Sequence, residues 1–386
     1  MRLNVARAGW VAVAVALAGP AGVLAQAKPA SASAQPPATT TSKPAPPKVQ
    51  APAPGKPAAA PVPDTSATTR ASLARARAAA RAKQAAIERQ QRELMTPKFK
   101  RDAVGNLVPD IQAAAAIVFN PQTGQVLWEE NSHERRSVAS LTKVMTAVTF
   151  MADDPDLNQE VVVTRTDMLR ASTTYLKAGD RLTLGNVLHL ALIPSDNAAA
   201  RVLARTAEGG ATAFIDRMNQ MARQLGLADT HYEDPTGLDP GDVSSAYDYS
   251  HLISFASSDE RLGPIMRTSE YDVHLANRAP FTIHSTNKLL GTDVDVRGGK
   301  TGFIAKAGYC LATLLQVPQG SQVAVVVLGA ATSATRFWDA RHLFSWVVGR
   351  TQGLIGGGDP KPAAALPPSR DVPALTLIAQ PVRLIR

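Results

Sequence analysis

Cysteine is nearly absent from this chain of 386 residues, in which Cys310 is the only one. A single cysteine excludes an intrachain disulfide, and the apolar neighbours of Cys310 indicate a packed core residue. Histidine is sparse as well: the seven histidines are scattered and show no H-x-x-x-H or comparable ligand spacing. The sequence therefore disfavours a metallopeptidase, and we expect neither a metal nor another cofactor.

Long apolar runs are missing beyond the N-terminus, so no later segment is predicted to span a bilayer. Residues 1–27 carry two arginines, an apolar run and the small-residue sequence Ala25-Gln26-Ala27. This order is typical of a secretory signal peptide with its cleavage site. Gly19-Pro20 interrupts the apolar run, which disfavours an uncleaved anchor, and no cysteine follows the run, which excludes a lipoprotein. We expect export across the inner membrane and a location in the periplasm or cell envelope.

Large apolar side chains are rare in residues 28–68, where Pro, Ala, Thr, Ser and Lys dominate. This stretch is predicted to be a disordered linker, since it cannot bury a core. Residues 69–109 are predicted to form a basic, partly helical arm, with ten basic and two acidic residues between Arg70 and Arg101. The arm (70–101) is either a solvated spacer or a contact for anionic envelope polymer or lipid. Because aromatic residues are not interleaved with its charges, nucleic acid is not an expected partner.

Three short motifs follow one another along the rest of the chain: Ser140-Leu141-Thr142-Lys143, Ser195-Asp196-Asn197 and Lys300-Thr301-Gly302. Any one of them alone is weak, because small polar triplets recur by chance. All three in this order predict a serine acyl-transferase that acts on D-Ala-D-Ala peptides or β-lactams.

The first motif lies in a predicted apolar helix over Val138–Met151, with Ser140 in the first turn. Lys143 stands three residues later, on the same face. A serine hydroxyl needs a base to take its proton, and lysine can be that base only when its amine is neutral. Burial and a second cation, for which Lys300 is the candidate, both favour the neutral amine. The alternative, a serine N-cap followed by a solvated lysine, fits the apolar neighbours poorly.

The second and third motifs could also be ordinary structural features without a catalytic role. Ser195-Asp196-Asn197 follows an apolar helical run that Pro194 ends, so it is predicted on a helix–helix connection. Taken alone it would be an ordinary helix cap. Lys300-Thr301-Gly302 is predicted between two strands, Val294–Lys300 and Tyr309–Val317, where a glycine allows close approach of a substrate that pairs with the strand. Taken alone it would be an ordinary turn.

Residues 110–350 resemble the catalytic domain of the low-molecular-mass penicillin-binding proteins, the D-alanyl-D-alanine peptidases of family S11. Beyond the three motifs, the resemblance includes Asp234-Pro235-Thr236-Gly237-Leu238, the stretch Ser285–Leu290 and the run Lys300–Leu311 (KTGFIAKAGYCL). One position departs from the pattern, because Asp242 stands where the family usually has asparagine. The resemblance implies an acyl-enzyme, no cofactor, peptidoglycan stem peptides and cross-links as substrates, and β-lactams as acylating inhibitors.

The resemblance also assigns roles to residues. Ser140 would attack the carbonyl of the penultimate D-Ala, Lys143 would accept its proton, and Ser195 would relay a proton to the leaving amine. Asn197 would hold the substrate amide and Lys143.

In the third motif, Lys300 would supply positive potential, and Thr301 with Gly302 would bind the carboxylate end of the substrate. The backbone N–H groups of Ser140 and Phe303 would form the oxyanion hole.

The order of predicted elements indicates an α+β fold of the β-lactamase/transpeptidase-like type. Strands at both ends and helices between them predict an antiparallel sheet flanked by helices, with a helical subdomain over about Val138–Leu225 and the site in the cleft between the two parts. Residues 351–386 are predicted to be a flexible tail. A plan without the extra C-terminal β-domain of many family members resembles the endopeptidase branch, which cuts D-Ala–diaminopimelate cross-links.

Two rival functions remain open at this point. A class A β-lactamase shares all three motifs, but it also needs a Glu-x-x-Leu-Asn stretch, which is missing here. A non-catalytic envelope-binding protein with the same fold is disfavoured because every reactive residue is present.

Overall fold

The computed structural model describes residues 65–94, 96–172, 174–318, 320–351 and 353. The predicted signal peptide, the linker up to residue 64 and the tail from residue 354 lie outside the described residues. Contacts divide the chain into two units, Met1–Thr69 and Arg70–Arg386, and the second contains every element from β1 onward.

Helix α1, Thr65–Leu94, covers most of the predicted basic arm. Its sequence is dominated by alanine and arginine, which are strong helix formers. The side chains of Leu73 and Ile87 are exposed on it. None of the helices in the described part of the chain has the length and apolar character needed to cross a bilayer.

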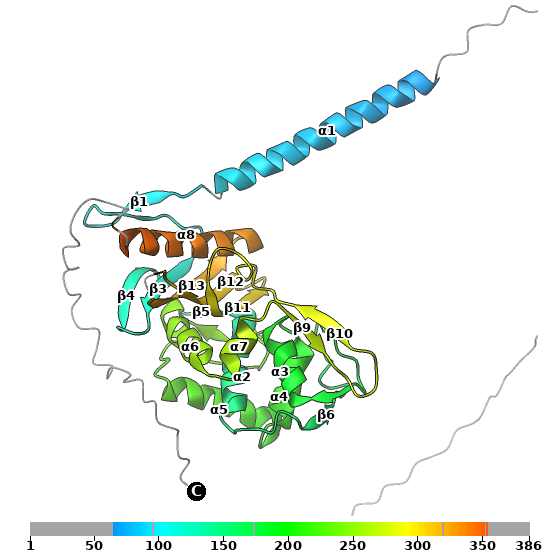
Figure 1. Cartoon of the computed structure of the whole chain (residues 1–386), viewed down its shortest axis with the longest axis vertical. Helices are drawn as coiled ribbons and strands as arrows, with labels where there is room; N and C mark the ends of the chain where they lie inside the picture. Colours follow the sequence, from blue (N-terminus) through cyan, green and yellow to red (C-terminus); the bar gives the residue numbers. More distant parts are fainter. Residues whose placement is uncertain (1–64, 95, 173, 319, 352, 354–386) are drawn as a thin grey trace, which may run out of the picture. The chain divides into compact units, whose positions relative to one another are not determined.

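A five-stranded antiparallel sheet, with strand order β11-β12-β13-β3-β4, forms the centre of the catalytic region (Figure 1). Its strands are β3, Ala115–Asn120; β4, Gln125–Glu130; β11, Val296–Ile304; β12, Gly308–Gln316; and β13, Gln322–Ala330. Strand β13 pairs with β3, placing Val326 opposite Ile117. Segments about 200 residues apart in sequence therefore share one sheet, and β11 is left as an edge strand.

The two faces of the sheet contribute to two separate cores, because successive strand residues point to opposite sides. Ile117 and Val326 pack with the helices that follow the first motif, whereas Val118 and Val325 pack against helix α8, Ser333–Thr351. In Figure 1, α8 lies on one side of the sheet and α6, Ala246–Ser258, on the other. This arrangement confirms the predicted α+β fold.

The helical part consists of α2 to α5 and α7, with boundaries set by local caps. Thr183 accepts a hydrogen bond from the backbone of Asn186 at the start of α3, and Asp196 accepts one from Ala199 at the start of α4. The helices are α2, Thr142–Met151; α3, Leu184–Leu192; α4, Asn197–Thr206; α5, Gly210–Gln224; and α7, Leu262–Met266.

Two predictions about secondary structure were wrong. The helical block is interrupted by the hairpin of β6, Glu160–Val162, and β7, Arg181–Thr183. The strand predicted to end at Lys300 continues to Ile304, so the Lys300 motif lies inside β11 and faces β12.

Both errors have a physical cause. Strands of two to four residues are too short to show an alternating pattern in the sequence. The extension of β11 depends on its hydrogen bonds to β12, which cannot be predicted from its own polar, glycine-rich sequence. The other short strands are β1, Phe99–Arg101; β2, Leu107–Pro109; β5, Arg136–Ser137; β8, Val243–Ser244; β9, Glu270–Val273; and β10, Phe281–His284.

Candidate active site

Ser140 lies on a short 3₁₀ turn, Ala139–Leu141, that runs directly into helix α2. The side chain of Ser140 is partly exposed, whereas its two neighbours in the turn are buried. Two glycines pack against this turn. A Cβ atom at position 237 would collide with the carbonyl of Ala139, and one at Gly302 would lie 3.1 Å from the backbone nitrogen of Ser140. The glycines therefore let two distant segments touch the backbone of the nucleophile candidate.

Lys143 is fully buried, and its amine has three oxygen neighbours. Its Nζ lies 3.0 Å from Oγ of Ser140, 2.7 Å from Oδ1 of Asn197 and 2.6 Å from the carbonyl oxygen of Thr236. A neutral amine has two N–H donors and one lone pair. When the two N–H groups are donated to Asn197 and Thr236, the lone pair is left for the hydroxyl of Ser140.

Electrostatics also favour a neutral Lys143. Burial lowers the pKa of this lysine to about 7, although the carboxylates of Asp234, Asp196 and Asp242 act in the opposite direction. The amine is therefore neutral in a large fraction of molecules near neutral pH, as general-base chemistry requires.

The second motif joins α3 to α4, as predicted. Ser195 has a φ of +67°, a left-handed conformation that is costly for a residue other than glycine. Asp196 caps α4 and also accepts hydrogen bonds from Thr174 Oγ1 at 3.0 Å and from the backbone of Tyr175 at 2.6 Å. The carboxylate thus fixes the turn, while Ser195 and Asn197 face the other two motifs.

The third motif completes the group. Nζ of Lys300 donates to Oγ of Ser195 at 2.7 Å and to the carbonyl of Thr301 at 2.9 Å. Burial lowers the pKa of Lys300 well below its usual value, and the nearby cations Lys143 and Arg336 lower it further. The hydroxyl of Thr301 lies 2.6 Å from that of Thr286. All eight residues predicted for the site lie on the 3₁₀ turn Ala139–Leu141, α2, the α3–α4 connection, α4 or β11: Ser140, Lys143, Ser195, Asn197, Lys300, Thr301, Gly302 and Phe303.

Asp242, the position that departs from the family pattern, is buried beneath the first motif. Its Oδ2 accepts from Thr142 Oγ1 at 3.1 Å, and its Oδ1 accepts from the backbone of Glu233 at 2.7 Å and of Asp234 at 3.1 Å. Burial and the neighbouring Asp234 raise the pKa of Asp242 to about 7. This carboxyl therefore connects the start of α2 to the loop that carries Thr236.

Sequence reasoning missed three contributors to this arrangement. The carbonyl of Thr236 binds Lys143, and a backbone atom leaves no signal in the residue type. Thr286 contacts Thr301, although the sequence singled it out only as part of a longer stretch. Arg336, on α8, donates to the carbonyls of Gly302 at 3.0 Å and Cys310 at 3.2 Å. These contacts stabilise the end of β11 from the side of the sheet that α8 covers. In the sequence, the available signal for Arg336 was an arginine directly before Phe337 and Trp338 in the closing helix.

The fold and this grouping together define a serine peptidase with a β-lactamase/transpeptidase-like fold. In the described residues, no three His, Cys, Asp or Glu side chains gather where they could hold a metal ion. A family model described as D-alanyl-D-alanine carboxypeptidase, peptidase S11, matches residues 102–332. The chain belongs to this family, and it is a serine peptidase that acts on peptidoglycan.

Named relatives agree with this assignment. The chain is 32% identical over 247 residues to a D-alanyl-D-alanine endopeptidase of Pseudomonas aeruginosa, covering 62% of this chain and 79% of the relative. It is 31% identical over 263 residues to a D-alanyl-D-alanine endopeptidase of Escherichia coli, covering 67% and 82%.

Solved structures show the same fold. A mutant of the Streptomyces K15 DD-transpeptidase matches with a TM-score of 0.59 and 27% identity over 62% of this chain and 98% of that one. The D-alanyl-D-alanine carboxypeptidase of Mycobacterium tuberculosis matches with a TM-score of 0.59 and 26% identity over 64% and 95%.

Proposed function

We propose that the protein cleaves the bond after the penultimate D-Ala of peptidoglycan peptides through an acyl-enzyme on Ser140. The observation that carries the proposal is the environment of Lys143, whose two fixed acceptors direct its lone pair at the serine hydroxyl. Lys143 takes the proton as Oγ attacks the carbonyl carbon. The backbone N–H groups of Ser140 and Phe303 stabilise the oxyanion.

Collapse of the tetrahedral intermediate breaks the C–N bond, and the leaving amine needs a proton. Ser195 relays to this amine the proton that Lys143 took from Ser140, which returns Lys143 to its neutral form, while Nζ of Lys300, 2.7 Å away, holds the Ser195 hydroxyl in place. Thr301 and Gly302 bind the terminal carboxylate, Asn197 holds the substrate amide, and water then releases the acyl group. A β-lactam acylates the same serine, because its carbonyl and carboxylate match those of the peptide.

For the bond that is cut, we propose endopeptidase activity on D-Ala–diaminopimelate cross-links, alongside or in place of D-Ala-D-Ala carboxypeptidase activity. The match to two endopeptidases over 79% and 82% of their lengths supports this preference. Carboxypeptidases match as well, over 62% and 63% of Escherichia coli DacC and DacD and over 88% of a Streptomyces carboxypeptidase, which is why both activities are tested.

The test is incubation of the purified protein with cross-linked muropeptides and, separately, with uncross-linked pentapeptide muropeptides. Conversion of cross-linked dimers to monomers is expected, with or without release of free D-Ala from the pentapeptide. Turnover of neither substrate, together with no labelling by a fluorescent penicillin, would contradict the proposal. Penicillin hydrolysis without muropeptide turnover would instead indicate a β-lactamase.

We place this activity in the periplasm, after export directed by the predicted signal peptide. For the basic arm, we predict contact with an anionic envelope polymer or lipid, because its helix α1 is rich in arginine. A solvated spacer remains the simpler reading of the same sequence.

Replacing Asp242 with asparagine is expected to shift the pH dependence of acylation. Acylation of the wild type should fall about tenfold per pH unit below the pKa of Lys143, because only the neutral amine is a base. Ionised Asp242 raises that pKa. Because the pKa of Asp242 is itself about 7, its charge is present mainly at pH 7 and above. Loss of that charge should lower the pKa of Lys143 and make acylation at pH 7 about 1.5-fold to twofold faster, with almost no change at pH 6, where Asp242 is already mostly protonated.

The measurement is the rate of penicillin acylation against pH. Asparagine can still accept from the backbone of Glu233 and Asp234, so the loop is expected to keep its shape, whereas Asp242→Ala should lower the melting temperature. An acylation rate at pH 7 that is unchanged or slower in Asp242→Asn would contradict the expected coupling.

A further inference from the structure

A pocket adjoins the exposed ring of Phe303, at the end of β11 just beyond the third motif. Its volume is about 550 Å³, and it is formed where β5, the β11–β12 turn and the end of β13 meet. The lining residues that matter for its chemistry are Arg136, Phe303, Lys306, Tyr309 and Gly329. None of the roles described above uses this pocket.

The lining combines two cations with a pair of aromatic rings. The rings of Phe303 and Tyr309 are stacked with their centroids 4.2 Å apart. The side chain of Arg136 is 27% exposed, but its Nε–H is buried as well as unpartnered among the described residues, so the guanidinium reaches a ligand through its Nη atoms. No acidic residue lines this pocket. An anionic group is therefore the ligand that its charges favour.

Arg136 is available for such a ligand. Its one ion-pair partner among the described residues is Glu134, with Nη1 and Oε1 2.7 Å apart, and the Glu134 side chain is 51% exposed. An exposed pair of this kind is weak. A Cβ atom at Gly329 would lie 3.1 Å from Nη2 of Arg136, so the glycine leaves the space that the guanidinium occupies.

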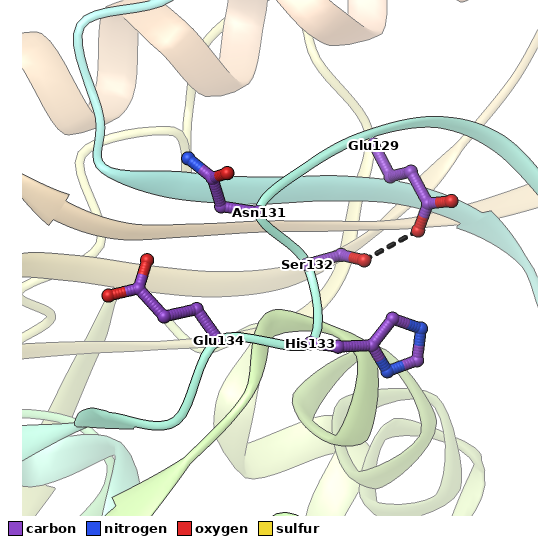
Figure 2. A pocket seen from close by; sticks show the side chains of 5 residues that line it. All are labelled: Glu129, Asn131, Ser132, His133 and Glu134. Carbon is purple, nitrogen blue, oxygen red and sulfur yellow. Dashed lines mark hydrogen bonds between the residues drawn. The ribbon is translucent and has the colours of Figure 1, made fainter.

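A neighbouring hollow provides a contrast (Figure 2). It is lined by Glu129, Asn131, Ser132, His133 and Glu134, and Ser132 donates to Glu129 at 2.5 Å. Its two carboxylates would repel an anion. The figure shows Glu134 directed away from His133, which leaves Glu129 and Glu134 on separate sides of the loop. Of these two hollows, the Arg136 pocket is therefore the one suited to an anion.

The direction of a substrate along β11 brings its upstream part to this pocket. In the proposed mechanism the terminal carboxylate lies at Thr301 and the reacting carbonyl at the N–H of Phe303. The peptide then runs antiparallel to the edge strand β11. With a rise of about 3.3 Å per residue, the residue that precedes the acylated D-Ala lies beside Ile304 and Ala305, at the mouth of the pocket.

We propose that the Arg136 pocket binds a carboxylate on the side chain of the residue that precedes the acylated D-Ala. This assignment rests on the proposed peptidase function and adds a determinant of substrate choice to it. Arg136 and Lys306 supply the charge, and the stacked pair of Phe303 and Tyr309 supplies an apolar wall for the methylene chain that carries the carboxylate.

The test compares two peptides, N-acetyl-X-D-Ala-D-Ala with X either lysine or diaminopimelate. The two side chains differ only by a carboxylate at the carbon that bears the terminal amine. The wild type should hydrolyse the diaminopimelate peptide with a kcat/KM about tenfold higher. In Arg136→Gln the ratio of the two kcat/KM values should fall towards one, and in Lys306→Gln it should fall in part.

Arg135→Gln is the matched control, because Arg135 is adjacent but donates instead to the carbonyl of Asp229, at 3.1 Å. It should keep the wild-type ratio. Penicillin labelling of every variant shows whether the site is folded. If Arg136→Gln does not fold, the ratio of the two kcat/KM values in Lys306→Gln tests the assignment instead. Equal hydrolysis of both peptides by the wild type, or an unchanged ratio in both pocket variants, would overturn the assignment. Hydrolysis of neither peptide would overturn the proposed function, and this assignment with it.

Discussion

Ser140→Ala is expected to abolish both penicillin labelling and peptide hydrolysis, with a loss of at least about a thousandfold. Among the described residues, this is the one hydroxyl that contacts the buried amine, 3.0 Å away. Its removal costs one hydrogen bond, worth about 1 kcal/mol, so the protein should remain folded. The measurements are labelling by a fluorescent penicillin on denaturing gels, muropeptide turnover and the melting temperature.

Ser137→Ala is the matched control for this experiment. Ser137 lies three residues earlier on β5, and its buried hydroxyl has no hydrogen-bond partner among the described residues. The same deletion there should leave labelling close to that of the wild type. Labelling of Ser140→Ala at a rate near that of the wild type would refute Ser140 as the nucleophile.

Lys143→Met should lose acylation almost as completely, by about 10³-fold, because the hydroxyl then has no base. Methionine keeps most of the buried length of lysine and removes only the amine, whereas Lys143→Ala also creates a cavity. Acylation should be followed by penicillin labelling over time, with the melting temperature as the check on folding. The binding of an uncleaved substrate should persist, since Thr301 and Gly302 are intact.

Lys143→Arg distinguishes a base from a simple positive charge. Arginine keeps the charge but cannot deprotonate in a protein. A base role predicts that Lys143→Arg is as inactive as Lys143→Met. Acylation by a folded Lys143→Arg protein at a rate near that of the wild type would show that the charge, rather than proton transfer, is what the serine needs.

The sequence predicted which residues meet at the candidate site better than it predicted the strands around them. Lys143 lies on a helix with a strong apolar run, and Asn197 follows another such run, Val187–Ile193. Apolar runs of this kind indicate buried elements before the tertiary partners are known. The Lys300 motif was expected between strands and lies within one, because its strand character depends on pairing with β12. The β-strand propensity of a segment does not show that it will pair with a strand elsewhere in the chain.

The contacts that sequence could not supply are backbone contacts and distant side-chain contacts. The amine of Lys143 is oriented by the carbonyl of Thr236, 93 residues later. Asp242 was noted as an unusual residue, but its link to Thr142, 100 residues earlier, becomes visible only in the fold. The basic pocket around Arg136 likewise forms from strands that are close only in space.

The central sheet also determines when the enzyme can become active. Strand β3 near the start of the catalytic region is flanked by β13, so Ile117 finds its partner Val326 only after most of the chain is available. Every side chain of the candidate site lies between these two strands in sequence. Pairings across such long separations form slowly, because loop closure precedes the gain from contact. We therefore expect the Ser140 site to be completed, and acylation to begin, only once β13 has joined the sheet.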